Sequence, residues 1–288
     1  MSHILDAAEL PPPRGRRRRR RLALPIYVGL VIAYLLVPIA VMILYSFNGS
    51  NAHLPTVTFK LQGFTTEWYR TWNKVPGLTP AFYLSLRLAF ASAITAAVLG
   101  TMLALALVRY RFRGKGMTEQ ILFLNIAAPE IVLGAALLGF FITLNLPKGF
   151  LTLFLAHVMF SVAYVTLTVR ARLIGFDRSI EEAAQDLGAT ALVTFRKITL
   201  PLIFPAVLAG ALLAFALSID DFVTSNFVSG TTATFPLWVW GAVKVGIPPQ
   251  VFVLGTMIFI VGVSFAVMNL LWQARKDRAA KVPRLRQR

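Results

Sequence analysis

Three acidic side chains interrupt long apolar stretches of this sequence. Glu130 lies within residues 118–144, and Asp220 and Asp221 lie within residues 203–224. A charged side chain near the centre of a bilayer costs about 3 kcal/mol on insertion scales, so such a group normally faces a polar path or a partner. Carboxylates in these positions would attract a cation, and we interpret the three acids as candidates for lining a solute path.

A structural role is the alternative for the same acids. Arg87, inside another apolar stretch, could pair with one of them, and the two aspartates could simply lie at the outer membrane interface. Neighbouring residues on a helix point about 100° apart, so only one aspartate needs to face a path while the other caps or pairs. Trp238 and Trp240, further along the chain, could add cation–π contacts to an ammonium group.

No catalytic motif accompanies these acids. The sequence GKG at 114–116 lacks the upstream glycine and the following Ser or Thr of a phosphate-binding loop, and the three histidines, His3, His53 and His157, are scattered. A lone histidine such as His157 is more often a hydrogen-bonding group between helices than a proton carrier. The absence of cysteine excludes disulfides and thiolate metal sites. We therefore predict a chain with no catalytic residues, metal or cofactor of its own.

Composition indicates an all-α integral membrane protein. The chain has 288 residues, 57% of them hydrophobic, and a mean hydropathy of +0.70. Apolar stretches long enough to span a bilayer predict six transmembrane helices, the third broken or kinked at Pro129. Shorter helices are predicted in the outer segments 65–72 and 225–250. The six predicted spans are 22–46, 82–108, 118–144, 149–169, 203–224 and 251–272.

The positive charges indicate how the chain is oriented. A net charge of +17 could suggest a nucleic-acid partner, but the basic residues lie beside apolar stretches, so we predict none. Residues 14–21, 109–116, 170–197 and 274–288 hold seven, four, five and seven Lys or Arg, together 23 of the 29. The positive-inside rule then places these segments and both termini in the cytoplasm, in a multi-pass protein of the cytoplasmic membrane.

This pattern divides the chain into three parts. Residues 1–21 are predicted to be a disordered basic tail, and 274–288 a second basic tail, on either side of a transmembrane domain at 22–273. The arginines at 16–21 could also contact anionic membrane lipid.

A polar segment at 177–201 separates the fourth and fifth predicted spans. Ser179 precedes Glu182 by three residues, the spacing of a capping box, and Glu181 adds negative charge near the same helix start. We expect a short helix from about Ile180 that Gly188 can end. Its apolar stripe at helical spacing consists of Ala183, Ala184 and Leu187.

The spacing in this segment resembles the cytoplasmic coupling loop of type I ABC importer permeases. The pattern is E-A-A, three residues, G, nine residues and I-x-L-P, carried here by Glu182, Ala183, Ala184, Gly188, Ile198, Leu200 and Pro201. The resemblance implies the type I ABC importer permease fold. It also implies that the loop from Glu181 to Pro201 contacts a separate ABC ATPase, which binds and hydrolyses the ATP.

A second resemblance narrows the solute. The sequences SIDDFVTSNFVSG at 218–230 and TFPLWVWGAVKVGIPPQ at 234–250 are similar to the spermidine/putrescine permeases, and the family resemblance covers residues 26–273. It implies a complex with a second homologous permease, two ATPase copies and an extracytoplasmic substrate-binding protein. Relatives that move iron, phosphonates or small organic acids keep the solute open at this point.

Two other classes of protein fit the sequence less well. A channel or secondary carrier would need its own ion-coupling acids and usually an internal repeat. The sequence shows no repeat and only three acids away from the ends of the predicted spans. A purely structural scaffold would not need acids in such costly positions.

The charge pattern makes the topology testable in a chain without cysteine. Single cysteines introduced within 14–21, 109–116 and 274–288 should react with a thiol reagent only from the cytoplasmic side, because positive segments are retained there. Labelling of any of them by an impermeant reagent in intact cells would contradict this orientation.

Overall fold

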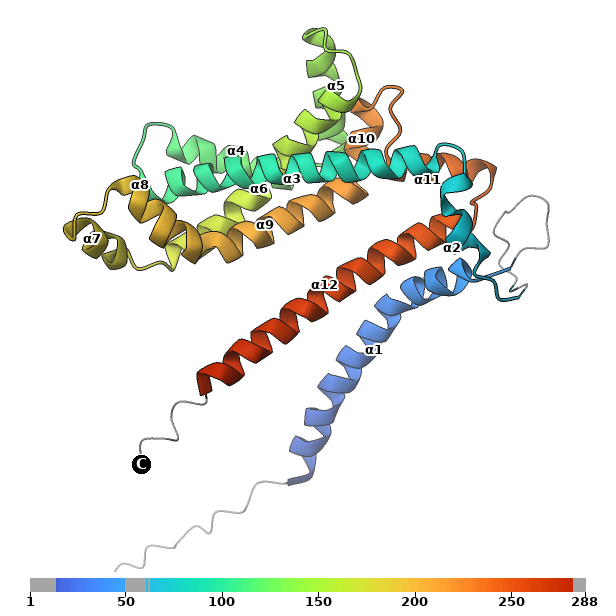
Figure 1. The fold of residues 1–288 in the computed structure, drawn as a ribbon, viewed down its shortest axis with the longest axis horizontal. Helices are drawn as coiled ribbons and strands as arrows, with labels where there is room; N and C mark the ends of the chain where they lie inside the picture. The colour runs from blue at the N-terminus through green and yellow to red at the C-terminus, as the bar shows by residue number, and fades with distance from the viewer. Residues whose placement is uncertain (1–13, 50–60, 62, 282–288) are drawn as a thin grey trace, which may run out of the picture. The chain divides into compact units, whose positions relative to one another are not determined.

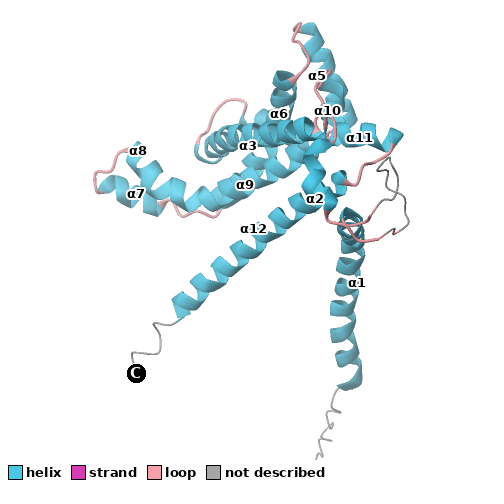
Figure 2. Ribbon diagram, turned by 45° about the vertical axis from the view of Figure 1, so that its right-hand side comes forward, coloured by secondary structure: helices cyan, strands magenta, loops and turns pink. Residues whose placement is uncertain are grey.

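The structure is a computed structural model that describes residues 14–49, 61 and 63–281. The described chain consists of helices joined by loops (Figure 2), which confirms the all-α class. It divides into two compact units. One is Asn73–Ile247, and the other comprises Met1–Trp72 and Pro248–Arg288.

Three long helices form the centre of the larger unit. They are α3 (Leu78–Arg109), α6 (Phe150–Ile174) and α9 (Leu200–Asp220), which lie side by side (Figure 1). Small residues at their contacts let the backbones approach closely, as is usual between membrane helices. The buried cluster between them consists of Ala93, Ala96, Ala104, Val165, Val169, Leu173, Ile203 and Ala214.

The third predicted span is broken. It forms α4 (Lys115–Ala127) and α5 (Glu130–Thr143), and the direction of the chain bends by 113° between them. Pro129 has no N–H for a helical hydrogen bond, and Ala128 before it takes the extended conformation that a following proline favours. The predicted break is confirmed, and it places Glu130 at the start of a new helix.

Short helices lie at the two ends of the central bundle (Figure 1). At one end, α7 and α8 are followed by a π-helical turn, η2, that leads directly into α9. Toward the other end, α10 and α11 follow α9. Their bounds are α7 Ser179–Asp186, α8 Ala191–Thr194, η2 Phe195–Thr199, α10 Val223–Val228 and α11 Phe235–Val245.

The smaller unit pairs the first and last long helices. Helix α1 packs along α12, and the Tyr45 and Phe252 rings lie 6.1 Å apart. The Tyr69 hydroxyl of α2 lies 2.8 Å from the Ser46 hydroxyl, so the short helix predicted within 65–72 is confirmed and is tied to the end of α1. The bounds are α1 Arg14–Ser46, α2 Glu67–Thr71, the 3₁₀ turn η1 Trp72–Lys74, and α12 Gln250–Lys281.

The helices match the predicted spans with shifted ends. Leu24–Ser46, Leu78–Arg109, Phe150–Ile174 and Ala191–Asp220 are long and apolar enough to cross a membrane, and the bent pair α4–α5 is a fifth candidate. The sixth predicted span lies within α12, and the count of six stays a prediction. The first basic tail lies partly within α1, which begins at Arg14, and the second lies partly within α12. Residues 1–13 and 282–288 fall outside the described chain.

Close packing makes Gly100 a test of this bundle. A Cβ at Gly100 would lie 2.7 Å from the Val165 Cβ, whereas a Cβ at Gly139 of α5 would meet nothing within 4 Å. Both positions are helical, where Ala is intrinsically better than Gly. We expect Gly100→Ala to destabilise the purified protein by about 1–3 kcal/mol through overpacking. Gly139→Ala should leave its thermal midpoint in detergent unchanged or raised, and equal midpoints for the two variants would contradict the packing.

Candidate functional site

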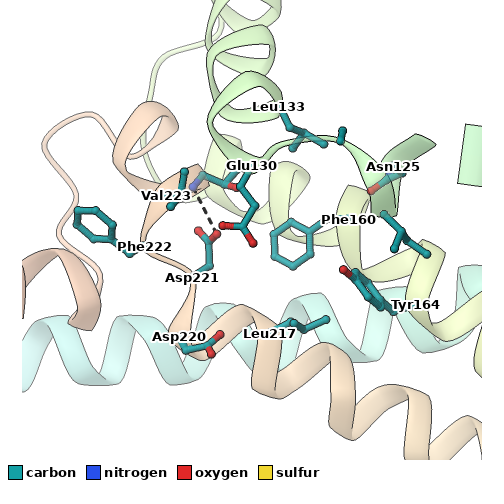
Figure 3. A pocket seen from close by; sticks show the side chains of 13 residues that line it. Asn125, Glu130, Leu133, Phe160, Tyr164, Leu217, Asp220, Asp221, Phe222 and Val223 are labelled. Carbon is teal, nitrogen blue, oxygen red and sulfur yellow. Dashed lines mark hydrogen bonds between the residues drawn. The ribbon is translucent and has the colours of Figure 1, made fainter. Parts of the chain in front are cut away.

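A cavity of about 350 Å³ opens where the broken helix α4–α5 meets the end of α9 (Figure 3). Its walls come from α4, α5, α6 and α9 and from the turn that enters α10. All three acids singled out from the sequence line it. The lining residues are Asn125, Ile126, Ala128, Glu130, Leu133, Phe160, Tyr164, Leu217, Asp220, Asp221, Phe222, Val223 and Thr224.

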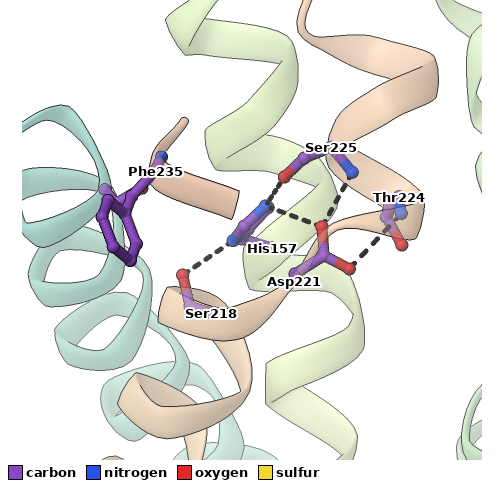
Figure 4. A network of polar contacts seen from close by, with 7 residues as sticks. His157, Ser218, Asp221, Thr224, Ser225 and Phe235 are labelled. Carbon is purple, nitrogen blue, oxygen red and sulfur yellow. Dashed lines mark hydrogen bonds and ion pairs between the residues drawn. The ribbon is translucent and has the colours of Figure 1, made fainter. Parts of the chain in front are cut away.

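Asp221 is held in place by a buried histidine (Figure 4). Its carboxylate accepts the backbone N–H of Ser225 at 2.7 Å and of Thr224 at 3.4 Å, at the start of α10, and lies 3.5 Å from His157 Nε2. The His157 side chain is fully buried, with Nδ1 2.7 Å from the Ser218 hydroxyl. The network joins α6, α9 and α10, so the expectation that His157 makes hydrogen bonds between helices is confirmed.

Asp220 and Glu130 are the acids that remain exposed in the cavity. Helix α9 ends at Asp220 because Asp221 has an extended backbone, and the two carboxylates therefore have different surroundings. The Asp221 side chain is only 8% exposed, whereas Asp220 and Glu130 are exposed residues. Asp221 therefore caps and pairs while Asp220 lines the cavity, and a solute path past Asp220 stays a prediction.

Asn125 adds an acceptor to the same cavity. Its Nδ2 donates to the Met159 carbonyl at 3.0 Å, and its buried Oδ1 has no hydrogen-bond partner among the described residues. An unpaired buried acceptor costs free energy unless a ligand or water supplies a donor. Two exposed carboxylates and a free carbonyl, beside the rings of Phe160 and Tyr164, form a site suited to a hydrogen-bonding cation.

The two tryptophans singled out from the sequence do not line this cavity. Trp240 packs against Phe222, with ring centroids 5.3 Å apart, and the Lys244 ammonium lies 5.6 Å from the Trp240 ring. Trp238 lies against Gly77, and a Cβ added at Gly77 would be 2.9 Å from the Trp238 Nε1 atom. Their role in cation binding is therefore not supported by their positions.

Arg87 pairs with none of the acids that line the cavity. Its guanidinium lies 6.0 Å from the centre of the Phe150 ring, and the described part of the chain shows no ion pair for it.

A second site lies in the polar segment after α6. Glu181 of α7 is buried, and its carboxylate accepts hydrogen bonds from the Arg109 guanidinium and the Thr199 hydroxyl. Glu182, the glutamate of the E-A-A pattern, is exposed. The expected Ser179 cap is wrong. Instead the Ser179 N–H donates to Asp177 at 3.0 Å, which holds the pKa of that carboxyl below its usual range.

The turn after α7 requires glycine. Gly188 has φ +87°, a conformation that L side chains rarely adopt, and a Cβ there would meet nothing within 4 Å. The predicted helix end is therefore confirmed, and its reason is backbone conformation. Ala183 and Leu187 are exposed and Ala184 is half-buried, so much of the apolar stripe has no cover within the described chain.

The rest of the motif lies where the chain enters α9. Ile198 lies in the π-helical turn η2, in which the Leu200 N–H donates to the Phe195 carbonyl five residues earlier. Pro201 follows in the first turn of α9, as predicted. Sequence reasoning missed Arg109 and Thr199, the partners of Glu181. It also missed Phe160 and Tyr164, which line the cavity. Nothing in the spacing of these residues distinguishes them from other span residues.

Comparison with known proteins gives consistent similarities. Residues 96–278 match the family described as binding-protein-dependent transport system inner membrane component. The chain is 39% identical over 246 residues to the spermidine/putrescine transport system permease protein PotC of Haemophilus influenzae, covering 85% of this chain and 94% of that protein. It is 41% identical over 263 residues to the putrescine transport system permease protein PotI of Escherichia coli K12, covering 88% and 92%.

The fold is shared with a solved transporter of low sequence identity. A crystal structure of a bacterial ABC transporter that imports the acidic polysaccharide alginate contains a chain with a TM-score of 0.67 and 17% identity, covering 90% of this chain and 99% of that one.

Proposed function

The chain belongs to the family of binding-protein-dependent transport system inner membrane components, and we propose that it is a permease subunit that imports a polyamine such as spermidine or putrescine. The observation that carries the solute class is the similarity to PotC and PotI over most of their length. The cavity supports it independently, since its exposed charges, Glu130 and Asp220, are both negative.

The cavity charges suit a solute with several ammonium groups. One carboxylate about 4 Å from an ammonium is worth about 4 kcal/mol at an effective dielectric of 20, before desolvation. Two such contacts favour a cation over an anion or a neutral solute. Asp221 contributes less, because its carboxylate is already engaged by His157 and by the start of α10.

The energy for import is proposed to come from a partner ATPase that docks on α7. Glu182, Ala183 and Leu187 form an exposed face on a helix that ends at the glycine turn. The small side chain of Ala183 and the glycine turn allow close approach of another protein at this face. The remaining proposed partners are a second homologous permease and an extracytoplasmic binding protein, in a complex whose cytoplasmic side holds both termini of this chain.

The solute class and the cavity are tested together by acid substitutions. In proteoliposomes that contain the whole complex, wild type should accumulate spermidine or putrescine only with ATP. Glu130→Gln and Asp220→Asn should each raise the half-saturating polyamine concentration about tenfold, a loss of about 1.4 kcal/mol, because each removes one attractive charge. Basal ATP hydrolysis and assembly should stay near wild type.

Two variants separate this effect from general damage. Glu67→Gln removes an exposed acid far along the chain from the cavity and should import normally. Asp221→Asn should lower the amount of folded protein, because it leaves His157 without its carboxylate partner. Wild-type kinetics for both Glu130→Gln and Asp220→Asn would mean that these acids are structural and would remove the physical support for polyamine import.

Coupling is tested at Gly188 with a matched glycine. A left-handed conformation costs an L residue about 1–2 kcal/mol, so Gly188→Val should distort the end of α7 without changing membrane insertion. We expect loss of ATPase binding, or ATP hydrolysis without import. Gly114, with φ +92° and equally open surroundings, lies in another loop. Gly114→Val suffers the same strain and should still import, whereas normal import by Gly188→Val would contradict the role of α7.

A further inference from the structure

Glu181 joins its own helix to two other elements, one of which, α3, is far from it in the sequence. It lies on α7, and its carboxylate contacts Arg109, the last residue of α3, and Thr199, the last residue of the turn η2. The Arg109 guanidinium also lies 3.5 Å from the Thr199 hydroxyl, so the three side chains form a closed set. The Glu181 side chain is 10% exposed and that of Arg109 is 20% exposed, which makes this a largely desolvated ion pair.

Helix α7 has few other attachments. It has eight residues, too short to be stable as an isolated helix. Its packing partners within the described chain are mainly α8 and η2, which follow it in the sequence. The face of α7 that points away from these partners is exposed, and Leu187, just after the helix, is 90% exposed. The contact with Arg109 is therefore the principal tie between α7 and the long helix α3.

We propose that Arg109, Glu181 and Thr199 form a brace that makes α7 move together with the adjoining ends of α3 and α9. Glu181 is then a positioning residue for coupling, with a role distinct from that of the exposed Glu182. This inference rests on the proposed function, because the brace matters only if a partner displaces α7.

The brace lies on a direct path to the cavity. Thr199 immediately precedes α9, whose 21 residues end at Asp220. At 1.5 Å per residue this helix is about 32 Å long. It packs closely on α3 and α6, so a displacement of its first turn is transmitted along it. Without the brace, α7 could be displaced while the first turn of α9 stays in place, and the acid at the far end of α9 would not respond.

The experiment measures the polyamine imported per ATP hydrolysed by the whole complex in proteoliposomes. Glu181→Gln and Arg109→Gln should each hydrolyse ATP while this ratio falls at least about fivefold, the lower end of typical coupling between sites. The double variant Arg109→Glu with Glu181→Arg restores opposite charges at the two positions and should recover most of the ratio. A role in folding alone would lower the amount of complex and leave the ratio per ATP unchanged.

A second ion pair provides the matched control. Arg170 of α6 lies 2.8 Å from Glu119 of α4, with side chains 29% and 33% exposed, so this pair joins α6 to α4. Glu119→Gln should leave the ratio at the wild-type value. An unchanged ratio in Glu181→Gln and Arg109→Gln would overturn the brace. So would a loss that Glu119→Gln shares and that the exchanged pair does not recover.

Thr199→Val covers the case in which the charge variants fail to assemble. It removes one hydroxyl, keeps the side-chain volume and leaves the ion pair intact. A lowered ratio in this variant supports the brace, and an unchanged ratio overturns it. Failure of the proposed function would look different, because wild type itself would then show no ATP-dependent polyamine import.

Discussion

A polar group in a hydrocarbon layer must find a partner, and this constraint determines where the polar side chains of the chain lie. His157 is fully buried in α6 and is satisfied by serines from α9 and α10 and by Asp221. An unpaired group there would cost several kcal/mol. Acids of the bundle that have no protein partner among the described residues are therefore informative. Glu130 and Asp220 remain exposed, and both face the same cavity.

Breaks in the helices are what bring these groups together. Pro129 ends one helix and starts another at Glu130, while the extended backbone of Asp221 ends α9 at Asp220. Irregular backbone at membrane depth is tolerated where it is covered by protein or lines a polar cavity. The Asp221 carboxylate satisfies this irregular backbone by accepting hydrogen bonds from the N–H groups at the start of α10. The same local feature thus satisfies the backbone and leaves its neighbouring carboxylate available.

Much of this arrangement follows from local signals in the sequence. Hydropathy predicts the long helices, Pro129 predicts the break, and Gly188 predicts the end of α7, because each depends on nearby residues alone. The tertiary partners do not follow from such signals. Sequence spacing makes Glu181 and Glu182 nearly equivalent, and only folding shows that the first is buried against Arg109. The aromatic rings of Trp238 and Trp240 suggest cation–π contacts to the solute, yet in the structure these rings pack beside Gly77 and against Phe222.

The close packing of the bundle limits how movement can pass through the larger unit. A Cβ at Gly210 of α9 would lie 3.2 Å from the Val165 backbone, and one at Gly100 of α3 would clash with the side chain of the same valine. Helices packed this tightly slide or tilt as bodies, since their side chains leave no room for independent bending. The wide turn η2 before α9 and the prolines near the start of α9 are the places where the hydrogen-bond ladder is weaker. Fixing η2 to α7 and α3 removes one place at which a displacement of α7 would otherwise be absorbed. The buried charge pair at the end of α3 would in this way help to transmit the displacement to α9.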